Sequence, residues 1–235
     1  MEMFISEAAV VVSFEQDNFV RLKQQKAEEI YGNISAKPST NTNVADTQNP
    51  SLPRILIKDV LKGVGISQVS ANLALGFDKN DGLDKQVETV MEYTDIFFND
   101  TKIFAGESNI KDTGIISSIL IPSSKPLNEL NPYIFKTFCN LEPLGEVVSS
   151  FYKIGFKTEN GLFLGVELGT YSQAQDAQGK ISSGYLVKID INNKPFFTVP
   201  GNPILINPSG IKEKFKSFIY NDIEKFFKKK LDIVL

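Results

Sequence analysis

The sequence of 235 residues contains no histidine and no tryptophan, and its only cysteine is Cys139. Histidine is the commonest general base and metal ligand in proteins, because its unperturbed pKa lies near physiological pH. Its absence excludes Ser-His and Cys-His triads, histidine-containing zinc sites and two-histidine iron sites. A single cysteine also excludes a disulfide within the chain. Any catalysis would use carboxylate, lysine or tyrosine side chains, and no pattern in the sequence commits to such a reaction.

Arginine is scarce: only Arg21 and Arg54 accompany the lysines, and the net charge is -3. Bidentate recognition of phosphate or guanine favours arginine over lysine. An acidic chain also has no general attraction for nucleic acid. Sequence-specific DNA binding is therefore not expected. We interpret the abundance of lysine, asparagine, isoleucine and phenylalanine as the mark of an AT-rich bacterial genome.

Targeting signals are missing too. Residues Met1–Phe14 lack the positive start, long apolar stretch and small-residue cleavage site of a signal peptide. No run approaches the roughly 20 apolar residues of a membrane span. We therefore expect a cytoplasmic protein. With 42% hydrophobic residues the chain has the composition of a globular protein with a packed core.

Apolar periodicity predicts a mixture of strands and helices. The hairpin signal is strongest at Glu159–Gly161, where an Asn-Gly pair separates two apolar runs. The low-complexity segment Ser35–Pro53 is predicted to be a mobile loop. The predicted strands cover residues 5–14, 54–61, 67–77, 114–121, 147–158, 162–171 and 181–192, and the predicted helices cover residues 19–31, 83–104, 126–140 and 209–231.

The order of these elements indicates the α+β class, because strands and helices do not alternate as they do in a doubly wound sheet. Residues 1–122 have the order β-α-β-β-α-β and are predicted to form a ferredoxin-like half with the mobile loop at 35–53. Residues 123–235 are predicted to form a helix plus a three-stranded meander closed by a C-terminal helix. We expect one compact unit. Whether the two halves share one sheet stays open.

The layout also resembles a known family. The order of the elements and three segments, Gly114–Pro122, Tyr185–Ile191 and Ile211–Phe227, resemble a sporadically distributed family of uncharacterised bacterial proteins of similar length. The resemblance covers most of the chain but includes no sharp motif. It supports the order of the elements and implies no catalytic residue. The sporadic distribution prompts the hypothesis of a factor associated with bacterial defence or toxin genes.

Three segments suggest a site, and each has a simpler interpretation. Asp78–Gly82 looks like the start of a calcium loop, but its glycine is fifth rather than sixth and Thr89 replaces the glutamate at position twelve. A turn with Asp81 or Asp84 near a helix start explains it. Gly63–Ile66 lacks the spacing of a phosphate loop and is interpreted as a hairpin turn. The carboxylates of Glu146 and Glu167 could face each other, but solvated surface groups are the default interpretation.

The C-terminal helix and Cys139 also suggest a site, and each has a simpler interpretation. Phenylalanines on one side of that helix are expected to pack on the sheet, with lysines in its last turn where the helix dipole favours them. An anionic surface could bind there instead, at Lys225, Lys228, Lys229 and Lys230. Cys139, beside Phe138 in an apolar helical setting, is interpreted as a buried, inert thiol, because no histidine exists to activate it.

Taken together, the sequence favours a non-enzymatic, cytoplasmic bacterial protein that acts through protein–protein contacts. The contact is with a partner protein or with a second copy of the chain in a homodimer. No catalytic, cofactor-binding or metal-binding residue is assigned. The expected contact regions are the loops Ser35–Pro53 and Ser172–Lys180 and the basic end of the last helix. The alternative is a Mg²⁺-dependent enzyme, or a small-molecule-binding protein, that uses carboxylates and lysines in a cleft between the two halves.

Overall fold

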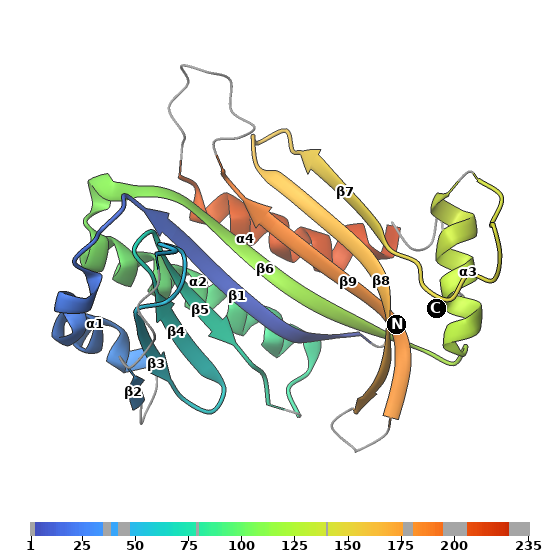
Figure 1. Cartoon of the computed structure of the whole chain (residues 1–235), viewed down its shortest axis with the longest axis horizontal. Coiled ribbons are helices and arrows are strands. Elements are labelled where there is room, and N and C mark those ends of the chain that lie inside the picture. The colour runs from blue at the N-terminus through green and yellow to red at the C-terminus, as the bar shows by residue number, and fades with distance from the viewer. Residues whose placement is uncertain are drawn as a thin grey trace.

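The computed structural model describes residues 3–34, 39–41, 48–78, 80–139, 141–175, 181–194 and 206–225. Its strands form one antiparallel sheet of nine strands in the order β2-β3-β4-β5-β1-β6-β9-β8-β7 (Figure 1). The strands are β1 (Phe4–Phe14), β2 (Ser39–Asn41), β3 (Ile55–Lys58), β4 (Lys62–Ile66), β5 (Ser70–Leu75), β6 (Ile110–Ser123), β7 (Tyr152–Lys157), β8 (Phe163–Gln175) and β9 (Ile181–Asn192). The α-helices are α1 (Gln24–Tyr31), α2 (Leu83–Ala105), α3 (Leu127–Phe138) and α4 (Pro208–Ser217). Single turns of 3-10 helix occur at Val20–Lys23, Gly32–Ile34 and Glu107–Asn109, and α4 continues into a π-helical turn, Phe218–Asp222.

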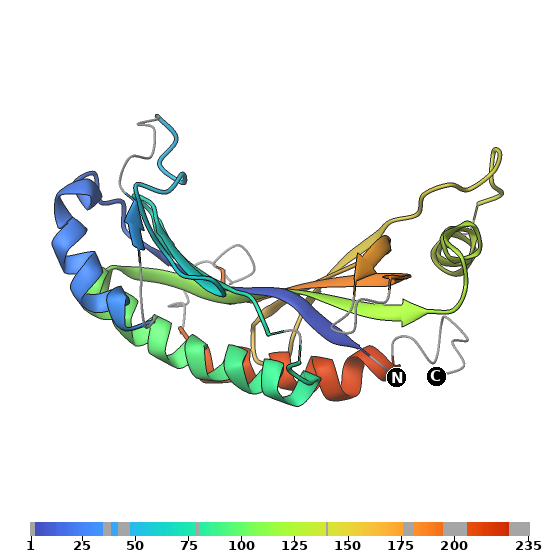
Figure 2. The same cartoon turned by 90° about the horizontal axis from the view of Figure 1, so that it is seen from below.

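Helices α2 and α4 run along the same face of the sheet, and no helix in the described residues packs on the middle of the other face (Figure 2). Side chains alternate between the two faces of a strand. In β1, Ala8, Val10 and Val12 are buried beneath the helices, whereas Ala9 and Val11 lie half-buried on the opposite face. The hydrophobic core therefore lies between the sheet and the two long helices.

Helix α2 follows from its sequence. Its buried residues Val87, Val90, Phe97 and Phe104 recur at helical spacing and form one apolar stripe. The helix ends at Gly106, whose φ of 92° is a conformation that favours glycine. The predicted boundaries at residues 83 and 104 are confirmed to within one residue.

The two halves of the sheet repeat one arrangement. β1, α1, β3, β4, β5 and α2 follow one another in the first half, and β6, α3, β7, β8, β9 and α4 follow in the second. The sheet order is symmetric about the central pair, because β1 is flanked by β5, β4 and β3 while β6 is flanked by β9, β8 and β7. The chain is thus built from two β-α-β-β-β-α units that meet at β1 and β6, with β2 as an additional short edge strand of the first unit.

The mixed helix-and-antiparallel-sheet class is confirmed, but the ferredoxin-like arrangement of residues 1–122 is not. The segment Gly63–Ile66, interpreted above as a hairpin turn, is most of strand β4, which adds a strand to the predicted order. Val64 and Ile66 face the core while the glycines occupy the alternate positions. Strand β6 pairs with both β1 and β9, so residues 1–122 and 123–235 share one continuous sheet.

Other expected boundaries also change. Within the predicted mobile loop 35–53, Ser39–Asn41 form strand β2, and residues 35–38 and 42–47 lie outside the described residues. The predicted polar loop 172–180 begins later, because strand β8 continues to Gln175 and residues 176–180 are not described. Pro132 does not interrupt α3. Among the described residues, no helix is both long and apolar enough to cross a membrane.

Candidate functional site

The uncovered face of the sheet is the candidate site. In Figure 1 it faces the reader, and in Figure 2 both ends of the sheet bend toward this side, which makes the face concave. Residues 48–54 rise at one end and residues 141–151 rise at the other. A sheet face that no helix covers is available to a binding partner.

Small residues line this face. The strand register places every glycine of the described strands on the uncovered side. Glycine weakens a strand, and within one it often marks close approach by another group. Here some of these positions are already covered: Pro53 and Leu56 lie over Gly65, and the ring of Phe163 lies over Gly155 and Gly165. Other positions are not covered in this way, so that hollows remain on the face.

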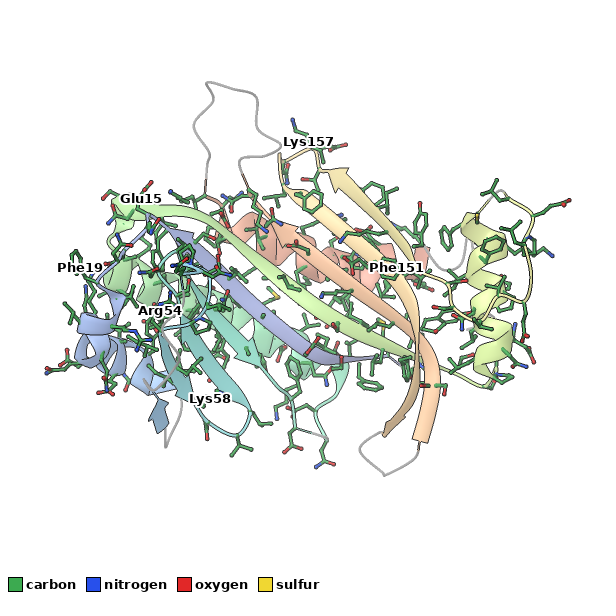
Figure 3. All side chains as sticks on the ribbon, viewed as in Figure 1. Glu15, Phe19, Arg54, Lys58, Phe151 and Lys157 are labelled. Carbon is green, nitrogen blue, oxygen red and sulfur yellow. The ribbon has the colours of Figure 1, made fainter. Side chains whose placement is uncertain are left out.

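One hollow on this face is a groove of about 500 Å³ between the β3–β4 hairpin and the centre of the sheet. Its floor contains Ala9, Gly63 and Ala74, from three neighbouring strands. The hairpin turn forms one wall, where the side chain of Val60 is 91% exposed. Figure 3 labels Lys58 at the base of this turn. The groove therefore combines a floor of small residues with an exposed apolar lip.

The far wall of the groove is polar. The side chains of Glu7, Ser118 and Lys188 line it, and Ser118 Oγ donates a hydrogen bond of 2.9 Å to Glu7 Oε1. Lys188 stands opposite Glu167 in the register of β8 and β9, and Glu167 in turn forms an ion pair with Lys153. Opposite charges on neighbouring strands stabilise a sheet and leave little net charge. The wall offers hydrogen-bonding and charged groups of both signs.

The opposite rim of the concave face is apolar. The side chains of Leu141, Leu144, Val148 and Phe151 are all exposed in the segment that links α3 to β7. Figure 3 labels Phe151 between β7 and α3. Contiguous exposed apolar side chains mark interaction sites more often than isolated ones do. Exposed apolar groups thus stand at both ends of the concave face.

Asn131 of α3 holds this rim in place. Its Nδ2 donates to the carbonyl oxygen of Val148 at 3.0 Å, and its Oδ1 accepts from the Ser150 N–H at 3.2 Å and from Thr170 Oγ1 at 3.0 Å. The Ser150 hydroxyl also donates to the Asn131 carbonyl at 2.7 Å. Asn131 itself is buried, and its bonds to Val148, Ser150 and Thr170 are partly shielded from water. The rim segment is therefore fixed at Val148 and Ser150.

A second hollow of about 510 Å³ lies on the helix-covered side, between the β7–β8 hairpin and the end of α4. It is lined by apolar groups that include Phe156 and Phe218, and by the ion pair of Lys214 and Asp222 at 2.7 Å. Residues 226–235, which follow directly, lie outside the described residues.

The strongest pKa shifts lie away from the groove. Burial raises the pKa of Tyr185, on the helix-covered side, to about 12. Burial, with the nearby carboxylates of Asp84 and Glu88, raises the pKa of Tyr220 to about 12. Burial also raises the pKa of Asp100 on α2 above its usual value. These shifts follow from packing around the helices.

The sequence-derived candidates are dispersed. Asp81 forms an ion pair of 2.5 Å with Lys85, and this contact lowers the pKa of the Asp81 carboxyl; Gly82, not Asp81, is the N-cap of α2. Glu167 pairs with Lys153 rather than with Glu146. Cys139 is half-buried at the end of α3. Lys225 is exposed, and Lys228, Lys229 and Lys230 lie outside the described residues.

Sequence reasoning missed the groove altogether. The one local signal was the alternation of Gly63, Val64, Gly65 and Ile66, which is the period of a strand with glycine on one side. Within the described part of the chain, no three histidine, cysteine, aspartate or glutamate side chains form a group that could hold a metal ion.

The fold and face define an α+β protein with a one-sided antiparallel sheet built from two similar units. Comparison of the sequence with family models and with curated proteins finds no match.

Proposed function

We propose that this chain is a non-enzymatic, cytoplasmic protein of a bacterium that acts by binding a partner protein on the concave, uncovered face of its sheet. One observation carries the proposal: no helix of the described residues covers the middle of one sheet face, and this face bears a groove of about 500 Å³. Solvent-exposed apolar groups at both ends of that face support it, since such groups gain free energy when a partner removes them from water.

The composition of the face favours a protein partner over nucleic acid. Lysines on it stand beside carboxylates in the strand register, as Lys188 does beside Glu167. Nucleic-acid-binding surfaces concentrate positive charge on one side. Protein interfaces combine an apolar centre with a polar rim, as the groove does with Ala74 on its floor and Glu7 at its wall. A regulatory or accessory role, including one linked to defence or toxin genes, fits a binding surface of this kind.

The test is affinity capture from native cell extract with quantitative mass spectrometry, using matched variants. Val60→Asp and Leu144→Asp place charge at the two ends of the concave face. Ile103→Asp is the control, because Ile103 is 63% exposed on α2, behind the sheet. We expect a stoichiometric partner that both face variants lose, with at least tenfold lower recovery, and that the control retains.

Equal recovery with all three variants would place the contact elsewhere and overturn the proposal. A partner lost only with Ile103→Asp would move the interface to the helix-covered side. Light scattering on the purified protein distinguishes a second copy of the chain from a different protein, because a homodimer doubles the measured mass in the absence of extract.

A further inference from the structure

One row of residues crosses the uncovered face from β3 to β7. Each member stands directly opposite the next in the strand register. The two units meet at the pair Ala9 and Ile116, and the row is symmetric about this pair. In order, the row is Lys58, Gly63, Ala74, Ala9, Ile116, Asp190, Gly165 and Gly155. Gly63 of the first unit thus corresponds to Gly165 of the second.

In the second unit an aromatic ring occupies this place. A Cβ atom on Gly155 would lie 2.6 Å from a ring carbon of Phe163, and one on Gly165 would lie 3.1 Å from the same ring. The ring therefore rests on the backbone of both glycines, and a side chain at Gly155 would require the ring to move. Aromatic side chains over strand glycines stabilise a sheet by covering the exposed backbone.

The same place in the first unit is open. Phe163 stands opposite Asn192 in the strand register. The residue of the first unit that corresponds to Phe163 is Leu61, which stands opposite Gly76: the Gly76 N–H donates to the Leu61 carbonyl at 2.6 Å. Leu61 lies over Gly76 and is 40% exposed. A Cβ atom on Gly63 would meet nothing closer than 3.8 Å. The groove thus lies over Gly63, the counterpart of Gly165, while Lys58 occupies the place of Gly155.

We propose that the groove over Gly63 and Ala74 binds an aromatic side chain of the partner polypeptide. Gly165, the counterpart of Gly63, supports the Phe163 ring, whereas Lys58 stands where Gly155 does, so that a ring in the groove would rest on Gly63 and extend toward Ala74. The inference rests on the proposed function, because it names the group that the partner presents to the concave face. A buried aromatic anchor in a pocket is the commonest kind of energetic centre in a protein interface.

The size and polarity of the groove indicate a polypeptide rather than a free aromatic molecule. A volume of about 500 Å³ exceeds what one ring fills, so that neighbouring residues of the partner also find room. The wall supplies Glu7 and Lys188, and the hairpin supplies Lys58, for contacts with the flanking chain. Val60 and Leu61 extend the apolar lip over the bound ring.

The experiment is an NMR titration of the ¹⁵N-labelled protein with two acetylated and amidated pentapeptides, Gly-Gly-Phe-Gly-Gly and Gly-Gly-Ala-Gly-Gly. We expect saturable shifts of the Gly63 and Ala74 amide signals with the phenylalanine peptide, at least fivefold larger than with the alanine peptide. Equal shifts with both peptides, or shifts centred on Phe156 and Phe218, would overturn the inference. N-acetylphenylalaninamide binding as tightly as the peptide would overturn the polypeptide assignment.

Two variants test the internal correspondence. Ala74→Phe fills the groove from an exposed position and should reduce the Gly63 shift at least tenfold. Phe163→Ala uncovers the second glycine floor, so that the phenylalanine peptide should now shift the Gly155 and Gly165 signals as well. Absence of this second site in a folded Phe163→Ala variant would show that the glycine floor does not bind aromatic rings.

Failure here is distinguishable from failure of the proposed function. A captured partner that is lost with Val60→Asp and Leu144→Asp but retained by Ala74→Phe would leave the concave face as the interface and overturn only the aromatic anchor. A partner insensitive to the first two variants would overturn the proposed function itself, whatever the peptides do.

Discussion

At the scale of single residues, a buried polar group with one hydrogen-bond partner gives the clearest prediction for the effect of a substitution on stability. The Ile5 N–H, at the irregular start of β1, donates to Oε1 of Gln86 at 2.7 Å, and both residues are buried. This bond ties the first turns of α2 to the central strand of the sheet. A buried donor left without an acceptor costs more free energy than the bond itself contributes.

Gln86→Leu should therefore lower the free energy of unfolding by about 1–3 kcal/mol. The substitution removes the terminal amide of the side chain, and with it the acceptor of the Ile5 N–H. Urea denaturation followed by circular dichroism measures the change. Gln25→Leu is the matched control, because Gln25 bonds Glu29 on the exposed side of α1 and its loss should cost less than about 0.5 kcal/mol. Equal effects at the two positions would contradict the argument.

Asp100→Asn should stabilise the protein at neutral pH. Burial raises the pKa of Asp100 in the folded chain, so the folded state holds this proton more tightly than the unfolded state does. Ionisation then removes stability as the pH rises through the folded pKa, and the loss is complete at neutral pH. The gain should stay below about 1 kcal/mol, because solvent screens a partly exposed carboxyl.

Thermal melts between pH 3 and pH 7 check this sign. The advantage of Asp100→Asn over the wild type should grow as the pH rises and then level off. Asp95→Asn is the opposite case, since Asp95 forms an ion pair with Lys212 and its neutralisation should not raise the melting temperature. An Asp100→Asn protein that is less stable at pH 7 would refute the burial argument.

At the scale of elements, Asn131 joins α3 to the apolar rim and to β8. Asn131→Ala should lower the free energy of unfolding by about 1–3 kcal/mol, because three partly buried hydrogen bonds are lost together. Hydrogen exchange should accelerate at Ser150, whose N–H loses its acceptor. Asn128→Ala, on the exposed side of the same helix, should change neither quantity. Unchanged exchange at Ser150 in the Asn131 variant would show that the rim is held by other contacts.

Local sequence patterns predicted an element correctly where they indicated one type of structure. They failed where one residue type indicated a turn and the spacing indicated a strand. Strand β9 was predicted at its observed bounds, and Val187, Ile189 and Ile191 alternate with polar residues in its second half. The Asn-Gly hairpin was also correct, with Gly161 at a φ of 75°. Strand β4 was missed because glycine indicates turns, and the alternation of Val64 and Ile66 was too short to outweigh it. The groove was missed with it, since Gly63 and its neighbours on β5 and β1 form the floor.

At the scale of the whole molecule, the arrangement of the strands could not be predicted from sequence. The pairing of β1 with β6 joins residues about a hundred positions apart, and no local pattern encodes such a register. The concave face depends on this pairing, because its two ends come from different units. The element count was nearly right, yet the symmetry that relates Gly63 to Gly165 became visible only in the assembled sheet.

The continuous sheet predicts that the two units unfold together. Helix α2 of the first unit packs on β1 and also contacts β6 and α4 of the second, so neither unit buries its core alone. The chain lacks tryptophan, so that the tryptophan fluorescence of a variant comes from the one tryptophan introduced. Phe98→Trp on α2 and Tyr152→Trp, at the site that stacks on Phe138 at 4.3 Å, report on the two units separately. Their urea midpoints should agree with each other and with circular dichroism, as cooperative unfolding requires. Two separated midpoints would show that the units are independent, and the concave face between them would then be a hinged surface rather than a rigid one.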